Sequence, residues 1–181
     1  RLGDRPHRLG NHPLYMAEDT ATADNRLPDV RWRLDGRGAL VTGASSGLGE
    51  RFARVLHQAG ANVLVTARRG DRLDTLASEC GDRIETMAGD ITDPRHRQAL
   101  AERLQPHGRL DVLVNNAGIC DAGRIEEQSL DELREVIEVN LISVIDLCRV
   151  MAPLLLASPV ASVINIASIY GVCLLYTSPS P

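Results

Sequence analysis

The stretch 39–49, Ala-Leu-Val-Thr-Gly-Ala-Ser-Ser-Gly-Leu-Gly, constrains the fold of this chain most strongly. Residues 39–42 have strand-forming character, and a helical pattern begins directly after the glycines, which are Gly43, Gly47 and Gly49. Glycine permits backbone angles that other residues resist, and it lets the main chain approach a pyrophosphate closely. The anion would bind the free N–H groups at the positive end of the helix dipole, where Ser45 and Ser46 also offer hydroxyl groups. Because glycine-rich turns also end ordinary helices, the rest of the chain has to decide between a binding turn and a structural one.

Alternating strand and helix patterns fill the chain from Leu34 onward. Strand patterns cover 39–42, 62–66, 84–88, 110–114 and 162–167. Helical patterns lie between them: one ends at Gly60, one covers 71–80, one starts at Thr92-Asp93-Pro94 and reaches Leu104, and one runs from the capping-box residue Ser129 to about Leu156. This order, with short connections, predicts right-handed crossovers and an α/β fold, a doubly wound parallel sheet of the Rossmann type that is truncated after its fifth strand.

Composition excludes several classes of function. With 181 residues, 44% hydrophobic content and a net charge of −4, the chain has the makeup of one soluble domain. Its arginines are spread among the acids, so no basic stripe predicts nucleic-acid binding. The cysteines lie far apart and lack the spacing of metal ligands; they are Cys80, Cys120, Cys148 and Cys173. No apolar run approaches the roughly 20 residues of a membrane span, and the N-terminus lacks a signal-type core, so we expect a cytoplasmic protein without metal, nucleic acid or membrane.

Three segments are expected along the chain. Residues 1–33 carry prolines and charges without apolar periodicity, which predicts an extended or disordered lead, with Met16 as a plausible true start. Residues 34–172 form the expected dinucleotide-binding domain. Residues 173–181 resemble a sequencing adapter translated in frame, so we expect the genuine protein sequence to end near Val172.

Four motifs in sequence resemble the short-chain dehydrogenase/reductase family over roughly residues 34–172. They are Thr-Gly-Ala-Ser-Ser-Gly-Leu-Gly at 42–49, Asn-Asn-Ala-Gly at 115–118, Asn140, and Asn-Ile-Ala-Ser at 165–168. The spacing of the first motif resembles the family's single-domain branch. The resemblance implies hydride transfer between a nicotinamide cofactor and a small-molecule carbonyl or alcohol substrate.

The resemblance also implies which residues bind the cofactor. They are Gly43, Ser45, Ser46, Gly47, Leu48, Gly49, Asp90, Ile91, Asn115, Ala117 and Gly118. Asp90 would accept a hydrogen bond from the adenine amino group, and Ile91 would add a main-chain contact. The structural alternative for the Asn-Asn-Ala-Gly stretch is a turn that merely ends a strand.

The cofactor itself is indicated by the end of the second expected strand. NAD enzymes usually place an acid there for the ribose 2′-hydroxyl, whereas this chain has Ala67 followed by Arg68 and Arg69. A guanidinium group suits a phosphate dianion, so Arg68 predicts NADP, with NAD less favoured. The alternative is that both arginines belong to a solvated helix start.

Ser168 and Asn140 match two members of the family's proton-transfer group, in which serine holds the substrate oxygen and asparagine orders a water. The family's tyrosine, about a dozen residues after the serine, and its lysine four residues later have no match here. Tyr170 is too close to Ser168, Tyr176 has no lysine behind it, and the sequence contains no lysine.

Two functions stay open from these residues. The first is a fragment of an NADP-dependent oxidoreductase, inactive as written, whose full-length form is a homo-oligomer because the helix ending near Leu156 resembles the family's dimerisation helix. The second is a non-catalytic nucleotide-binding or regulatory protein of the same fold. A methyltransferase is disfavoured by the glycine spacing.

Overall fold

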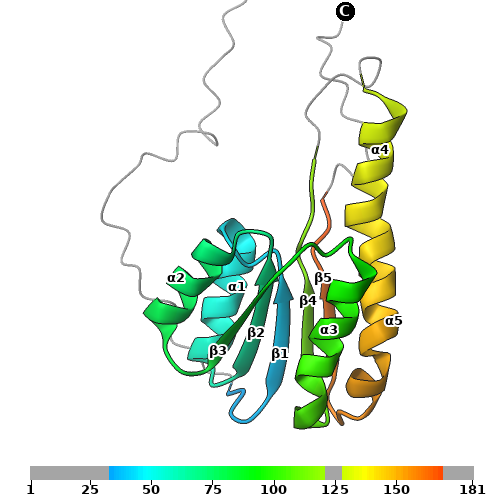
Figure 1. Cartoon of the computed structure of the whole chain (residues 1–181). Helices are drawn as coiled ribbons and strands as arrows, with labels where there is room; N and C mark the ends of the chain where they lie inside the picture. Colours follow the sequence, from blue (N-terminus) through cyan, green and yellow to red (C-terminus); the bar gives the residue numbers. More distant parts are fainter. Residues whose placement is uncertain (1–32, 121–127, 169–181) are drawn as a thin grey trace, which may run out of the picture.

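The computed structural model describes residues 33–120 and 128–168, so the expected N-terminal lead up to residue 32 and the expected tail 173–181 lie outside the described residues. Five parallel strands form one sheet in the order β3-β2-β1-β4-β5 (Figure 1). They are β1 (Gly38–Thr42), β2 (Asn62–Ala67), β3 (Ile84–Ala88), β4 (Val112–Asn115) and β5 (Ser162–Asn165). The order reverses between β1 and β4, which confirms the predicted doubly wound sheet.

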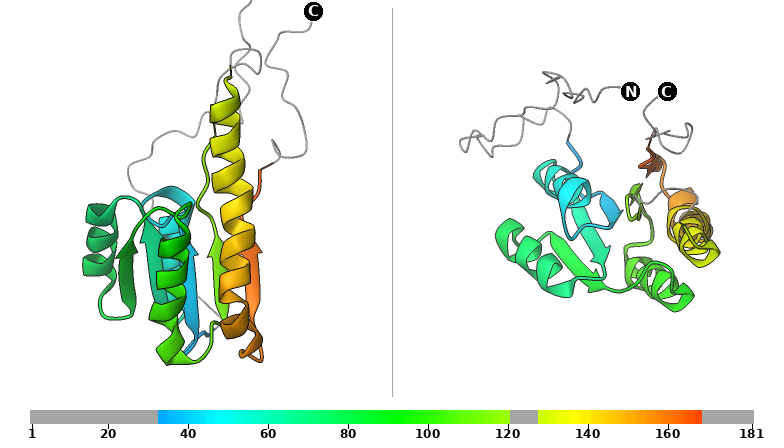
Figure 2. Two further views of the ribbon diagram at one scale, coloured as in Figure 1. Left: turned by 45° about the vertical axis from the view of Figure 1, so that its right-hand side comes forward. Right: turned by 90° about the horizontal axis from the view of Figure 1, so that it is seen from above.

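Helices cover both faces of this sheet (Figure 2). They are α1 (Gly47–Gln58), α2 (Gly70–Cys80), α3 (Pro94–Leu104), α4 (Leu130–Ile137) and α5 (Ser143–Leu156), with a 3₁₀ turn η1 (Gln105–His107) and a π-helical segment η2 (Glu138–Ile142). Helices α1 and α2 pack on one face, whereas α3 and α5 pack on the other. The strands β1, β2 and β4 are therefore largely buried between two helical layers.

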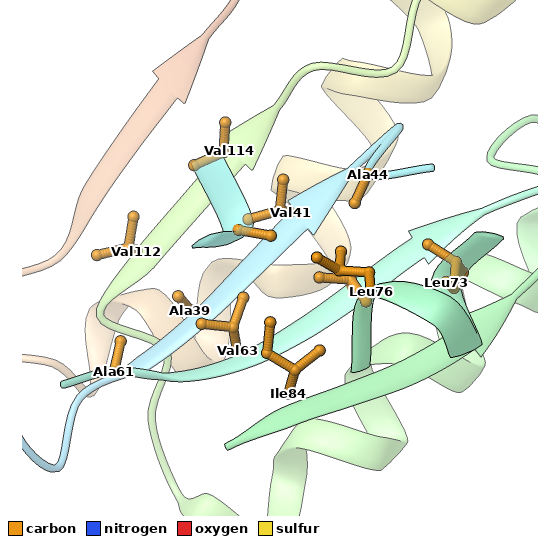
Figure 3. Packing of buried hydrophobic residues seen from close by; sticks show 12 residues of the cluster. Ala39, Val41, Ala44, Ala61, Val63, Leu73, Leu76, Ile84, Val112 and Val114 are labelled. Carbon is orange, nitrogen blue, oxygen red and sulfur yellow. The ribbon is translucent and has the colours of Figure 1, made fainter. Parts of the chain in front are cut away.

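Alternation of side chains divides the apolar strands between the two faces. Alanine and valine point toward α1 and α2, where they form the cluster in Figure 3 together with Leu73 and Leu76. The leucines between them, Leu40, Leu64 and Leu113, point the opposite way and pack against α3 and α5. An unbroken apolar run in sequence thus supplies two separate cores, because neighbouring strand residues face opposite sides of the sheet.

Local signals in the sequence set the helix ends. The Asp93 carboxylate accepts a hydrogen bond of 2.8 Å from the Arg95 N–H, and Pro94 occupies the first position of α3. Ser129 and Glu132 form the predicted capping box at the start of α4. These three predictions from sequence are confirmed residue by residue.

Helices α4, η2 and α5 are continuous over 27 residues, Leu130–Leu156, and α4 extends past the carboxyl ends of the strands (Figure 1). One row, which includes Leu147 and Met151, is buried, whereas Leu141 and Ile145 are exposed although they are equally apolar residues of the same predicted helix. By length and composition alone this helix is long and apolar enough to cross a membrane, a test that core helices of soluble proteins also pass. The sequence expectation that no such segment exists therefore does not hold for this helix.

Two strand boundaries lie two residues away from their predicted positions. The Leu110 N–H donates to the Leu154 carbonyl at 3.0 Å, which ties this residue to α5, so β4 begins only at Val112. Strand β5 ends at Asn165 instead of Ala167, after the Ile166 N–H has bonded to the Asn115 carbonyl at 2.9 Å. The first bond joins Leu110 to a helix and not to a strand, whereas the second still joins the chain after β5 to the end of β4.

Candidate functional site

A cavity of about 870 Å³ lies at the carboxyl ends of the strands, beside the point where the strand order reverses between β1 and β4. Open α/β sheets bind ligands at this point. Its lining residues come from the turns after β1 to β4 and from α4 and η2: Thr42, Gly43, Ser45, Ser46, Leu48, Thr66, Ala67, Arg68, Arg69, Gly89, Asp90, Ile91, Thr92, Asn116, Ala117, Gly118, Ile119, Arg134, Glu135, Glu138 and Val139. Nine of the fourteen site residues predicted from sequence are among them.

The turn after β1 needs its glycines for two physical reasons. Gly43 has φ +68° and Gly47 has φ +58°, a left-handed backbone that side chains disfavour. A Cβ on Gly43 would also lie 2.8 Å from the Cα of Ala117, and one on Gly49 would collide with the Gly43 carbonyl. The turn and the end of β4 can therefore approach only without side chains at these positions.

Asn116 joins these two segments. Its N–H and that of Ala117 both donate to the Thr42 hydroxyl at 3.0 Å, and its side-chain amide donates to the Thr42 carbonyl at 3.0 Å. No role was predicted for Asn116 from sequence, although it lies inside the Asn-Asn-Ala-Gly motif. Side chains of neighbouring residues in an extended chain point in opposite directions, so only one of the two asparagines is expected to face the cavity. In the structure Asn116 lines the cavity and Asn115 does not.

Arg69 reaches from the start of α2 to the turn before α1. Its Nη2 donates to the hydroxyl of Ser45 at 2.9 Å and to that of Ser46 at 2.7 Å. Its neighbour Arg68 lines the cavity and places its positive charge near Asp90. The two arginines therefore have different surroundings, a difference that the sequence did not reveal.

Asp90 forms a compact turn after β3. Its Oδ1 accepts hydrogen bonds from the Thr92 N–H at 2.9 Å and from the Thr92 hydroxyl at 2.8 Å. The Thr92 N–H makes the largest contribution to lowering the pKa of the Asp90 carboxyl; burial opposes it, and the Thr92 hydroxyl and the charge of Arg68 add to the lowering. The pKa therefore stays below its usual value, and an anionic acceptor faces the cavity.

A buried arginine holds the next residue of that segment. The Nη1 of Arg97 donates to the Ile91 carbonyl at 2.6 Å, and its Nε donates to Asp146 on α5 at 2.6 Å. Arg97 is only 3% exposed. The wall of the cavity at Ile91 is thus connected to the long helix through one guanidinium group.

Asn140 lies in the π-helical segment η2 and pairs with the backbone of Ile119. Its Oδ1 accepts from the Ile119 N–H at 2.9 Å, and its Nδ2 donates to the Ile119 carbonyl at 2.7 Å. Ile119 lines the cavity, but Asn140 itself does not. The side chain of Asn140 therefore fixes the cavity wall, and π-helical segments of this kind often occur at functional sites.

The other predicted site residues that do not line the cavity are Gly47, Gly49, Asn115 and Ser168. Asn115 is 3% exposed, and its Nδ2 donates to Oδ1 of Asn165 at 2.8 Å and to the sulfur of Cys148 at 3.4 Å. Ser168 is exposed and lies three residues beyond the end of β5. Tyr170 and Tyr176 lie outside the described residues.

Residues 37–178 match the sequence model of a family described as short chain dehydrogenase. Nodulation protein G of Rhizobium sp. (strain N33) is 39% identical over 142 residues, which cover 78% of this chain and 58% of that protein. A solved short-chain dehydrogenase from Streptomyces avermitilis is 40% identical with a TM-score of 0.70, over 75% of this chain and 50% of that one.

A metagenomic short-chain oxidoreductase, solved in complex with NADP, is 38% identical with a TM-score of 0.69, over 75% of this chain and 63% of that one. The chain therefore spans only about half the length of the curated relatives that it matches. The matched half includes the sheet and the cavity described above.

Proposed function

This chain belongs to the short-chain dehydrogenase family, and we propose that it is the cofactor-binding part of an oxidoreductase that uses NADP. The substrate class is a small-molecule carbonyl or alcohol. The cofactor would supply or accept the hydride, while the protein binds and orients it. A homo-oligomeric, cytoplasmic full-length protein is part of the same proposal.

The end of β2 carries the proposal for NADP over NAD. Ala67 occupies the position where an acid would bind a 2′-hydroxyl, and Arg68 lines the cavity directly after it. Guanidinium forms paired, charge-assisted hydrogen bonds with phosphate oxygens. The NADP complex of the metagenomic relative supports the same cofactor, since the two proteins share 38% identity.

The remaining roles follow from the position of each residue. The glycine turn with Ser45, Ser46 and Leu48 would hold the pyrophosphate at the start of α1. Asp90 would accept from the adenine amino group, and Ile91 would contact the same ring. Ala117 and Gly118 would bind the nicotinamide half, with Asn115 as a buried support behind them.

Ser168 and Asn140 are proposed to act on the proton side of the reaction, as the family resemblance implies. The matching tyrosine and lysine do not occur at the required spacing in the printed sequence. General acid–base help of this kind is worth on the order of 10²–10⁴ in rate. We therefore expect residues 1–181 to bind cofactor but to reduce no carbonyl with NADPH in a spectrophotometric assay, and measurable turnover would contradict this assignment.

The absence of lysine from the 181 residues also favours a second candidate, a non-catalytic nucleotide-binding protein of the same fold. Both candidates bind NADP. They differ in the gene that surrounds this sequence: an oxidoreductase gene continues into a tyrosine–lysine helix, whereas a binding protein has a stop codon after Pro181 in a clean genomic read.

The proposal is tested by the substitution Arg68→Ala. Loss of a charge-assisted contact to the 2′-phosphate should weaken NADPH binding by roughly 1.5–3 kcal/mol, about 10- to 150-fold, and leave NADH binding unchanged. Calorimetric titration of both cofactors measures this difference. Arg72→Ala is the matched control, because Arg72 is exposed on α2 outside the cavity and should change neither affinity. Equal losses for both cofactors in Arg68→Ala would refute the NADP assignment.

A further inference from the structure

The serine that precedes α1 does not cap it. Ser46 is the N-cap residue and has the extended backbone of one, with φ −172° and ψ 168°, yet its side chain makes no capping hydrogen bond. The hydroxyl instead accepts a hydrogen bond of 2.7 Å from Nη2 of Arg69. Serine is among the strongest N-cap residues, so its diversion by a neighbouring side chain calls for a physical reason.

A capping serine would compete with a ligand at this position. It would accept a hydrogen bond from the N–H of Leu48 or Gly49, the second and third residues of α1. The same first-turn N–H groups form the anion-binding end of a helix. With the hydroxyl held by Arg69, Ser46 does not cap these donors, and both Ser46 and Leu48 line the cavity.

Arg69 is well placed to hold the serine away. It is the N-cap residue of α2, so its backbone is anchored where β2 ends, and the Leu73 N–H bonds to its carbonyl at 3.4 Å. The same Nη2 also holds Ser45, whose hydroxyl accepts from it at 2.9 Å and from Nε at 3.2 Å. One guanidinium group therefore fixes two consecutive residues of the phosphate turn from a different crossover.

We propose that Arg69 is a positioning residue that keeps the Ser46 hydroxyl off the start of α1 and so keeps the first-turn N–H groups open for the cofactor's pyrophosphate. This inference rests on the proposed cofactor function and assigns different roles to the two neighbouring arginines. Arg68 discriminates between cofactors through the 2′-phosphate, whereas Arg69 sets the affinity for the pyrophosphate that NADP and NAD share.

Cofactor titration of the full 181-residue chain provides the first test. In Arg69→Ala the freed serine caps α1, so NADPH and NADH should both bind about fivefold more weakly, with their affinity ratio unchanged. In the Ser46→Ala background no capping hydroxyl exists, and Arg69→Ala should then change either affinity by less than about twofold. Loss for NADPH alone would make Arg69 a 2′-phosphate ligand and would overturn the inference, as would an equal fivefold loss in both backgrounds.

Hydrogen exchange of the ligand-free chain provides an independent readout. Capping by the freed serine should slow exchange of the Leu48 or Gly49 amide in Arg69→Ala, and the slowing should vanish in Ser46→Ala/Arg69→Ala. Unchanged exchange in Arg69→Ala overturns the inference. A chain that binds neither cofactor refutes the proposed function, whereas the exchange comparison still decides whether Arg69 restrains Ser46.

Discussion

Val41 in β1 and Val163 in β5 are the same residue type on parallel strands of one sheet, but Val41 is fully buried and Val163 is 45% exposed. Strand β1 lies between β2 and β4 and between two helical layers. Strand β5 pairs with β4 along one edge, and all four of its residues are exposed in the part of the chain that the structure describes.

The difference shows that apolar composition does not decide burial; the packing partners decide it. The buried row of α5, which includes Leu147, Met151 and Leu155, belongs to the cluster around Leu40 and Leu113 and leaves β5 uncovered. The opposite row of the long helix exposes Ile137, Leu141 and Ile145. Apolar side chains of β5 and of this row of the long helix are therefore exposed, as at surfaces that take part in association.

The largest expected effect compares two register partners across β4 and β5. Leu113 is completely buried and pairs with half-exposed Val163. Leu113→Ala should lower the free energy of unfolding by about 2–5 kcal/mol, because it removes buried methyl groups and leaves a cavity. Val163→Ala should cost less than about 1 kcal/mol, since water already reaches this side chain. Urea denaturation of both variants measures the contrast; similar losses would show that β5 is covered in solution.

A smaller effect is expected at the ion pair between the buried Arg97 of α3 and Asp146 of α5. Asp146→Asn leaves the buried Arg97 guanidinium without its counter-charge, which should cost about 1–3 kcal/mol of unfolding free energy in urea. Replacing both partners, as Arg97→Met with Asp146→Leu, should recover most of that loss. A double variant as unstable as Asp146→Asn would mean that the hydrogen bond from Arg97 to the Ile91 carbonyl carries the stabilisation.

The same pair gives a pH dependence with a defined sign. Hydrogen bonds from Arg149 and then Arg97 hold the pKa of the Asp146 carboxyl below its usual value. The stabilisation is therefore complete above the unfolded-state pKa of about 4 and is lost as pH falls through the lower folded-state value. Asp146→Asn should flatten the unfolding free energy in that acid range; an unchanged acid slope in this variant would contradict the assignment.

The smallest effect on stability is expected on the exposed row of the long helix. Ile145→Glu should change the free energy of unfolding by no more than about 0.5 kcal/mol, because the side chain is 57% exposed. It should nevertheless reduce self-association in sedimentation velocity, since a charge then interrupts the exposed apolar row. Arg51→Gln changes net charge by the same amount at an exposed position of α1 and should leave association unchanged. Equal behaviour of both variants would exclude this row as an association surface.

Much of the site could be predicted because its chemistry is local in sequence. The glycine turn, the residues Asp90 and Ile91, and the Ala-Gly pair after β4 each follow a strand directly, and parallel strands bring their carboxyl ends to one edge. Asn116 was missed because the contacts of two adjacent asparagines depend on how the chain leaves the end of β4. The diversion of Ser46 by Arg69 could not be predicted, since a serine before a helix ordinarily caps it.

The sequence by itself determined the order of elements, the caps of α3 and α4 and the parallel sheet, because these depend on periodicity, glycine and proline over a few neighbouring residues. Only the tertiary structure decided that Arg97 is buried against Asp146 49 residues away and that Leu147 is inside while Ile145 is outside. Contacts of this kind depend on which helix lies beside which strand. That relation arises from close packing of elements distant in sequence, for which no local pattern exists.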